Sequence, residues 1–264
     1  MPIFIDGREL KTEARALIRT AQVPPLRLTL LLLALSLGLS LLSAVVTFFA
    51  GEGTVVPLAQ LGYSVSIPPL PAVFVAMLIE LLTAVLRVGF AGCCLRFLRG
   101  ETASYANLFD AFPFAGQVAL LTILQEVLIG AGLSLFLVPG VLAALIYSLA
   151  PLFLCDDPDA GAFAAMRRSR RALRGYKGQL FTLLLSFLPL LLLVGLPVTA
   201  CEYALAAALP DSTAGNLLYV LLTGLVESAA MLYLTPYQTL ALCSFYRRVA
   251  GLPSADASDG DAPF

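Results

Sequence analysis

Three aspartates near the middle of the sequence are the first residues that could do chemistry. Asp156, Asp157 and Asp159 end an apolar run in the letters CDDPD, and such carboxylates could hold Mg²⁺ against a phosphate. A metal site of this kind draws ligands from two motifs, and the predicted loops on the same side offer no second acidic cluster. Asp156 or Asp157 can instead cap a following helix that has Pro158 in its first turn. We predict this cap, with Asp159 complementing the helix dipole.

Four glutamates form a second candidate set, because they lie inside long apolar stretches. They are Glu80, Glu126, Glu202 and Glu227, and Arg87 follows Glu80 by two turns on the same helix face. A charge in lipid costs about 2.5 to 3.5 kcal/mol, so these groups should face the interior of a helix bundle. Glu80, Arg87, Glu126 and Glu227 could form a proton- or cation-coupled polar cluster. Alternatively, the carboxylates tie helices together and Arg87 extends its side chain toward the membrane interface.

The third set is basic and lies just after the aspartates. It consists of Arg167, Arg168, Arg170, Arg171, Arg174 and Lys177. The arginines occupy one face of a predicted helix over 158–174, while small and apolar residues recur on the other face. The apolar face consists of Ala162, Ala165, Met166, Ser169, Ala172 and Leu173. This density of cations is typical of contact with anionic lipid headgroups, at about 1 kcal/mol per cation, although it could also serve only to orient the chain.

Several classes of chemistry lack their residues in this chain. It contains no histidine, which removes the usual general bases and triads, and it has no Walker loop, GxSxG or GxGxxG motif. Its five cysteines have neither zinc spacing nor a disulfide pattern. We therefore predict that the protein is not an enzyme and has no catalytic residue, metal site, cofactor or nucleic-acid partner.

Composition decides which elements must position these groups. The chain is 59% hydrophobic and 12% charged, so it has too little polar surface to cover a soluble globule of 264 residues. Roughly 20 helical residues cross a bilayer, and apolar runs of this length recur along the chain. The predicted fold is all-α, a polytopic helical membrane bundle. Its six predicted spans are 26–50, 69–95, 113–136, 139–155, 179–208 and 216–246.

Two further helices are predicted to lie on the membrane surface. An amphipathic helix over 6–22 precedes the first span, and the basic helix over 158–174 lies between the fourth and fifth spans. Residues 1–250 would form a single integral-membrane domain, and 251–264 a disordered acidic tail. Pro189, Pro197 and Pro236 should kink the long fifth and sixth spans.

The distribution of positive charge predicts orientation. Every Lys and Arg lies on one side of the six-span arrangement, which the positive-inside rule makes cytoplasmic together with both termini. Pro139-Gly140 then falls at the outer turn of a hairpin. The return arm 139–155 is short and contains Pro151, so a full crossing and a re-entrant helix both remain open.

The order and spacing of several short motifs resemble a bacterial family of polytopic membrane proteins, domain of unknown function 975 (DUF975). The matching residues are Lys11, Ala14-Arg15, Tyr105, Phe109, Pro139-Gly140, Tyr147, Asp157-Pro158, Ser169, the stretch 175–187, Pro236-Tyr237 and Phe245-Tyr246. The Pro-Gly pair, the aspartate and the small-residue helix are also similar to the membrane domain of some glycerophosphodiester phosphodiesterases. The resemblance implies a multi-pass protein of the bacterial plasma membrane and brings no established activity.

Two functions follow from these features. The first is a non-enzymatic protein that binds or organises membrane lipid, with anionic headgroups as partners of the basic helix. The alternative is a transporter or channel-like subunit that uses the glutamates inside the spans.

Overall fold

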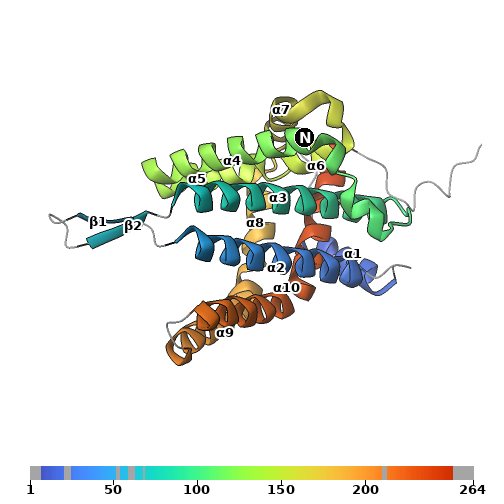
Figure 1. The fold of residues 1–264 in the computed structure, drawn as a ribbon. Helices are drawn as coiled ribbons and strands as arrows, with labels where there is room; N and C mark the ends of the chain where they lie inside the picture. Colours follow the sequence, from blue (N-terminus) through green and yellow to red (C-terminus); the bar gives the residue numbers. More distant parts are fainter. Residues whose placement is uncertain are drawn as a thin grey trace, which may run out of the picture.

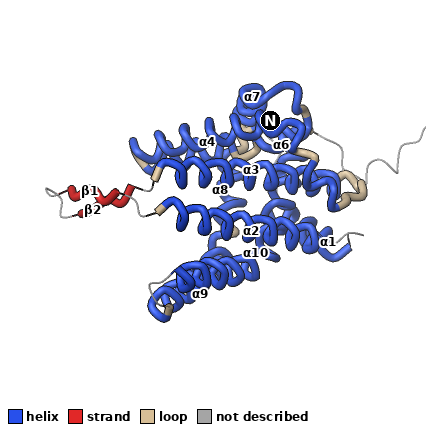
Figure 2. The backbone as a smooth tube through the Cα atoms, viewed as in Figure 1, coloured by secondary structure: helices blue, strands red, loops and turns tan. Residues whose placement is uncertain are grey.

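The computed structural model describes residues 7–20, 25–51, 54–58, 63–67, 69–209 and 213–251. Helix accounts for most of this chain, as Figure 2 shows. The α-helices are α1 (Gly7–Thr20), α2 (Pro25–Ala50), α3 (Leu70–Leu98), α4 (Ala115–Leu135), α5 (Leu137–Tyr147), α6 (Ala150–Asp156), α7 (Gly161–Ala172), α8 (Lys177–Leu185), α9 (Leu188–Ala208) and α10 (Thr213–Ala250). Three short 3-10 helices are η1 (Tyr105–Phe109), η2 (Phe112–Phe114) and η3 (Pro158–Ala160).

Six helical segments are long and apolar enough to cross a membrane, which fits a multi-pass membrane protein. They are Pro25–Ala50, Leu70–Leu98, Tyr105–Leu135, Leu137–Asp156, Lys177–Ala208 and Leu217–Ala250. All six predicted spans are therefore confirmed as helices of sufficient length and apolarity. The predicted acidic tail lies outside the described residues apart from Gly251.

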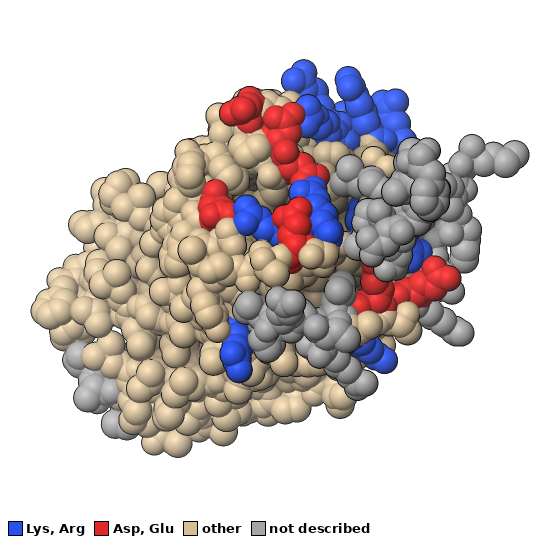
Figure 3. All heavy atoms as spheres, turned by 90° about the vertical axis from the view of Figure 1, so that its right-hand side faces the viewer, with Lys and Arg blue, Asp and Glu red and all other residues tan. Residues whose placement is uncertain are grey.

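The long helices give the bundle two distinct ends (Figure 1). α2, α3, α4 and α5 run side by side, with the α4–α5 turn and the α9–α10 turn toward one end. α1, α7 and the last turns of α3 and α10 lie toward the other, which we call the basic end. Figure 3 looks onto the basic end and shows Lys and Arg gathered there, with Asp and Glu among them. This face carries cations, as the sequence predicts for one side of the bundle, and its cytoplasmic orientation stays a prediction.

One element was not predicted. The segment after α2, expected to be a loop, contains strands β1 (Thr54–Leu58) and β2 (Tyr63–Ile67). They pair antiparallel, with Thr54 opposite Ile67. Their sequences, TVVPL and YSVSI, contain several β-branched or aromatic residues, which favour an extended backbone. The fold remains helical apart from this hairpin.

The predicted turn at Pro139-Gly140 is wrong by three residues. The chain turns at Phe136, whose extended backbone (φ −161°, ψ 152°) separates α4 from α5. Pro139 and Gly140 already lie inside α5. A Cβ atom on Gly132 would lie 2.7 Å from the Cα atom of Gly140, so this glycine pair lets α4 and α5 approach closely.

Prolines divide the later spans into shorter helices. Pro151 is the second residue of α6, after a break from α5, and the combined stretch Leu137–Asp156 has the length to cross. Pro189 lies in the first turn of α9 instead of kinking its interior, because a break after Leu185 separates α8 from α9. Pro197 and Pro236 lie inside α9 and α10, as predicted. In Figure 1, the first part of α10 lies beside α9 and its last part turns across the basic end.

The packed core lies toward the basic end. Fully buried side chains concentrate in the second half of α3 and the last third of α10, where Cys94, Leu240 and Phe245 are covered by α2 and by the α5–α6 junction. α9 has no buried residue. Because lipid can solvate apolar side chains that no other helix covers, the far end needs less contact between helices.

Candidate functional site

The basic helix forms where it was predicted and is held against the bundle by its small-residue face. Ala162, Ala165, Met166, Ser169 and Leu173 of this face are buried. The Ser169 hydroxyl donates to the carbonyl oxygen of Ile146 at 2.6 Å. These contacts fix the direction in which the arginines of α7 point. Placement of α1 and α7 on a membrane surface stays a prediction.

The cap predicted for the basic helix involves two residues in the structure, Asp157 and Gln117. Asp157 accepts a hydrogen bond from the Ala160 backbone N–H at 3.3 Å and thereby caps η3, with Pro158 first in that turn. It does not cap α7, because Gly161 has a φ of +78° and starts a new helix. An N–H group in the first turn of α7, that of Ala162, donates instead to the Gln117 Oε1 atom of α4 at 3.1 Å. Nothing in the sequence around Gln117 indicates this role.

The structure separates the predicted headgroup residues into three groups. Arg168 pairs with Asp157 at 2.8 Å. Arg171 and Arg174 are exposed, and Lys177 begins α8. Arg167 and Arg170 line a groove between α4, α5 and α7, together with Leu124, Leu128, Tyr147, Phe163 and Met166. We call this the α7 groove.

The α7 groove combines an apolar wall with two guanidinium groups. Its volume is about 380 Å³, and Phe163 is 60% exposed along it. Within the described part of the chain, neither Arg167 nor Arg170 has an acidic partner. The groove therefore offers unpaired positive charge directly beside exposed hydrocarbon.

The intramembrane polar cluster is assembled in part. Glu80 and Arg87 of α3 and Glu227 of α10 line one cavity, which α2 completes. The Arg87 Nη1 and Glu80 Oε1 atoms are 3.9 Å apart. Glu126 does not belong to this cluster, because it is exposed on α4, which lies on the opposite side of α3 from α2 (Figure 1). A helix that is apolar all round carries no periodic signal for which face its one glutamate takes.

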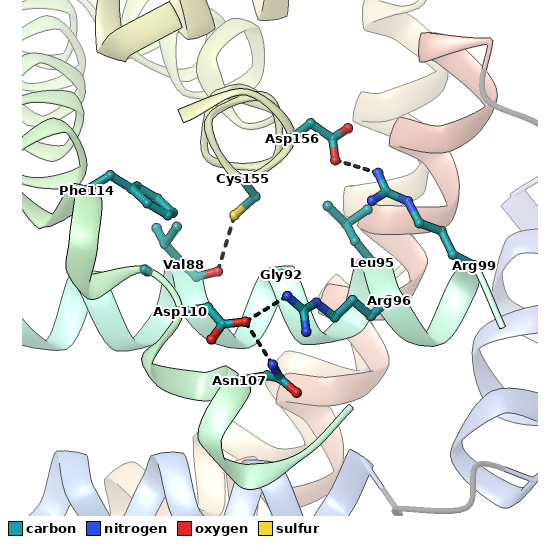
Figure 4. A pocket seen from close by; sticks show the side chains of 12 residues that line it. Val88, Gly92, Leu95, Arg96, Arg99, Asn107, Asp110, Phe114, Cys155 and Asp156 are labelled. Carbon is teal, nitrogen blue, oxygen red and sulfur yellow. Dashed lines mark hydrogen bonds and ion pairs between the residues drawn. The ribbon is translucent and has the colours of Figure 1, made fainter. Parts of the chain in front are cut away.

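A second polar cavity, at the basic end, was missed by sequence reasoning. It has a volume of about 210 Å³ between α3, η1 and α6, and Figure 4 shows its side chains. Arg96 pairs with Asp110 at 2.8 Å, and Asn107 also donates to Asp110 at 2.8 Å. Arg99 pairs with Asp156 at 2.5 Å. The two arginines and two aspartates neutralise each other, so the cavity ties elements together and presents no unmatched charge.

Asp156 joins three segments that are far apart in the sequence. It ends α6, accepts from Arg99 of α3, and also accepts from the hydroxyl of Tyr246 in α10 at 2.5 Å. The Tyr246 ring packs edge-on against Phe153, with 4.8 Å between centroids. The predicted cap is thus wrong for Asp156, which acts as a bridge between helices.

Asp156→Asn is expected to lower the free energy of unfolding by about 1 to 2 kcal/mol, because the charge-assisted hydrogen bonds weaken. Asp159→Asn serves as the control, since Asp159 does not take part in the hydrogen bonds that join Asp156 to Arg99 and Tyr246. Chemical unfolding of both variants in detergent, followed by circular dichroism, measures the difference. Equal stability of the two variants would contradict the bridge.

α1 closes the basic end against α8 and α10. Lys11 donates to the carbonyl oxygen of Ser186 at 3.0 Å and lies 4.5 Å from the Phe187 ring centroid, at the α8–α9 break. Burial lowers the pKa of the Lys11 amine, and the neighbouring charge of Arg15 lowers it further. Leu10 and Ala14 of the predicted apolar face are buried. The side chains of Leu17 and Ile18, and residue Ala21, lie outside the described residues.

Two ion pairs connect α1 with the end of α10. Arg247 pairs with Glu13 at 2.9 Å and donates to the carbonyl oxygen of Leu98 at 2.5 Å. Arg248 pairs with Glu9 at 3.0 Å. The first pair is the more enclosed, with side chains 11% and 27% exposed, against 35% and 66% for the second.

The cysteines contribute to packing. Cys93, Cys94 and Cys243 are buried, Cys155 and Cys201 are partly buried, and all five are free thiols. Across the described residues, no three His, Cys, Asp or Glu side chains come together as metal ligands.

Comparison with known proteins identifies one family. Residues 133–252 match the family model described as "Protein of unknown function (DUF975)". No curated protein and no solved structure matches the chain. The similarity to the membrane domain of glycerophosphodiester phosphodiesterases stays a prediction.

The matched range contains most of the motifs that suggested the family, and several of these residues make identifiable structural contacts. Gly140 lets α4 and α5 approach, Asp157 caps η3, Ser169 anchors α7, and Tyr246 binds Asp156. Lys11, Ala14-Arg15, Tyr105 and Phe109 lie before the matched range. The match over residues 133–252 supports the resemblance to the DUF975 family that the order and spacing of the motifs predicted.

Proposed function

We propose that this membrane protein binds an anionic membrane lipid in the α7 groove. The observation that carries the proposal is the position of Arg167 and Arg170, two cations without an acidic partner in the described chain, at the rim of an apolar wall. A lipid has the same two parts, a charged phosphate and a hydrocarbon chain. Arg binds phosphate well because its planar N–H groups match phosphate oxygens in pairs.

The walls of the groove suit an acyl chain. Leu124 and Leu128 are one turn apart on α4, and Phe163 faces them from the start of α7. A chain lying on these side chains would place its phosphate at Arg167 and Arg170, about one helical turn further along α7. Arg168 is held by Asp157 and is left out of this site, although the sequence placed it in the same set.

The proposal assigns the protein a non-enzymatic role and an orientation. The absence of histidine and of nucleotide-binding motifs in the sequence supports the first. The gathering of cations at the basic end supports a cytoplasmic position for that end, with α1 and the end of α10 beside it. In a bacterial plasma membrane the inner leaflet would then supply anionic lipid to the α7 groove.

Exchange of two arginines tests the groove directly. Arg167→Gln with Arg170→Gln is expected to reduce bound phosphatidylglycerol at least fivefold, measured by native mass spectrometry after reconstitution. Arg171→Gln with Arg174→Gln is the matched control, since it removes the same charge from the end of α7 and the turn after it, outside the groove. The control should retain the lipid.

Two results would overturn the proposal. Unchanged phosphatidylglycerol in the Arg167 and Arg170 variant would exclude the groove as the site. Equal losses in both double variants would show that the lipid responds to the overall charge of α7 and not to a formed site.

Two of the three glutamates in the predicted polar cluster are consistent with the transporter alternative. Glu80 and Glu227 line a common cavity and support a ligand site inside the bundle, whereas Glu126 takes no part in it. Movement of a proton or solute across the membrane stays a prediction.

A further inference from the structure

The cavity between α2, α3 and α10 lies about halfway along α3 and is separate from the α7 groove. Its volume is about 500 Å³, enough for a small organic molecule. Apolar side chains form much of its wall, among them Leu33, Leu37, Ile79, Phe90 and Met231. Polar groups enter from all three helices. The cavity therefore has the mixed lining of a ligand site and not the uniform lining of a packing defect.

The charges in this cavity do not balance. Arg87 is paired with Glu80, whereas Glu227 has no cationic partner in the described chain. The lining thus carries two carboxylates and one guanidinium, a net single negative charge when all three are ionised. A carboxylate at the depth of a membrane centre costs about 2.5 to 3.5 kcal/mol, and a bound cation offsets that cost.

The hydroxyl groups in the cavity are already committed as donors. Ser40 donates to the carbonyl oxygen of Ser36 at 3.0 Å, and Thr83 to that of Ile79 at 2.9 Å. Thr239 donates to the carbonyl oxygen of Thr235 at 2.8 Å. Each of these oxygens can still accept a hydrogen bond. Thr239 is twelve residues beyond Glu227 on α10, about 18 Å at 1.5 Å per residue, and is too far away to share a ligand group with it. Ser40 and Thr83 are the hydroxyl acceptors that can accompany Glu227, so a matching ligand must bring N–H donors as well as positive charge.

The cavity is accessible from outside the bundle. The Glu80 and Arg87 side chains are 66% and 67% exposed, so a ligand can enter from the side without separating the helices. At this depth along α3 the surroundings of a membrane protein are lipid tails. A ligand arriving by this route needs a hydrocarbon part, which the leucines and Met231 can cover.

We propose that this cavity binds a primary alkylammonium group, with the ammonium donating to the Glu227 carboxylate and to hydroxyl oxygens of the wall. A quaternary ammonium lacks the N–H donors, and an alcohol lacks the charge. Two sources share the chemistry, a free lipophilic amine and the headgroup of an aminolipid such as phosphatidylethanolamine.

Hexylamine is the probe that separates these ligands. The full-length protein is placed in phosphatidylcholine nanodiscs, which contain no primary amine, and titrated by calorimetry. Hexylamine is expected to bind saturably at one site, and hexyltrimethylammonium and hexanol at least tenfold more weakly. Competition by short-chain phosphatidylethanolamine would assign the site to a lipid headgroup, and lack of competition to a free amine. Absence of saturable hexylamine binding, or equal binding of hexyltrimethylammonium, would overturn the proposal.

Two glutamates at comparable positions within their helices provide a matched pair of variants. Glu227→Gln is expected to weaken hexylamine binding at least tenfold, and Glu126→Gln to leave it unchanged, because Glu227 lines the cavity and Glu126 does not. Unchanged binding in Glu227→Gln overturns the proposal. If that variant does not fold, as judged by gel filtration, the Ser40→Ala and Thr83→Val double variant decides, and unchanged binding there overturns the proposal equally. The Arg167 and Arg170 variant should bind hexylamine normally, which keeps this test independent of the α7 groove.

Discussion

Arg247→Met is expected to lower the free energy of unfolding by about 3 to 5 kcal/mol, the usual cost of removing one partner from a buried ion pair. The Arg247 side chain is 11% exposed and pairs with Glu13 at 2.9 Å. Methionine preserves much of the apolar stem but leaves the Glu13 carboxylate without its closest cation. It also leaves the Leu98 carbonyl oxygen without the guanidinium donor. Chemical unfolding in detergent, followed by circular dichroism, measures the loss.

Arg248→Met is the matched control, one residue further along the same helix. Its closest partner, Glu9, is 66% exposed, and its second contact, with Glu13 at 3.8 Å, is longer than the 2.9 Å contact of Arg247. Exposed pairs contribute about 0 to 1 kcal/mol. A loss in Arg248→Met as large as that in Arg247→Met would contradict the view that enclosure gives the Glu13 pair its importance. The double variant Arg247→Met with Glu13→Gln should recover part of the stability, because no buried charge is then unpaired.

Gly89→Ala is expected to destabilise the protein by about 2 to 3 kcal/mol, toward the upper end of the cost of overpacking. A Cβ atom at this position would lie 2.0 Å from the carbonyl oxygen of Leu108. Because that oxygen belongs to the backbone of η1, it cannot rotate away as a side chain would. The substitution therefore has to push η1 off α3 and open the neighbouring cavity that holds Arg96 and Asp110.

Gly92→Ala on the same helix should have the opposite sign. Its nearest contact would be the Cys155 sulfur at 3.8 Å, an ordinary van der Waals distance. Alanine also favours a helix over glycine by up to about 1 kcal/mol, so this variant should be neutral or slightly more stable. Thermal unfolding of the two variants side by side measures the difference. Destabilisation of both to the same extent would show that glycine at α3 is needed for a reason other than contact with η1.

The sequence predicted the features that depend on local pattern. Apolar length identified the six spans, and spacing along one helix identified the buried face of α7, including Ser169. Both signals are contained in short windows. The cations could be assigned to one side because successive spans cross the membrane in opposite directions. The side of each loop therefore follows from the number of spans before it, without any knowledge of packing.

Features that depend on contacts between distant segments could not be predicted in the same way. Asp156 and Tyr246 are 90 residues apart, and a helix stop and a helix bridge look identical in the letters CDDPD. Glu126 and Glu227 both occur in helices that are apolar all round, so nothing local told which glutamate faces a cavity. Pro-Gly favours turns, so the sequence predicts a turn at Gly140. In the structure the absence of a side chain at Gly140 instead lets α4 and α5 approach closely.

The ion pair between Glu13 and Arg247 also constrains the order of biogenesis. Its partners are 234 residues apart, near the two ends of the described chain. A ribosome makes α1 before α10, so Glu13 has no Arg247 to bind until the end of α10 has been synthesised. The last third of α10 also supplies much of the packed core. The basic end therefore closes only after α10 has been made, and a chain that stops before α10 leaves it open.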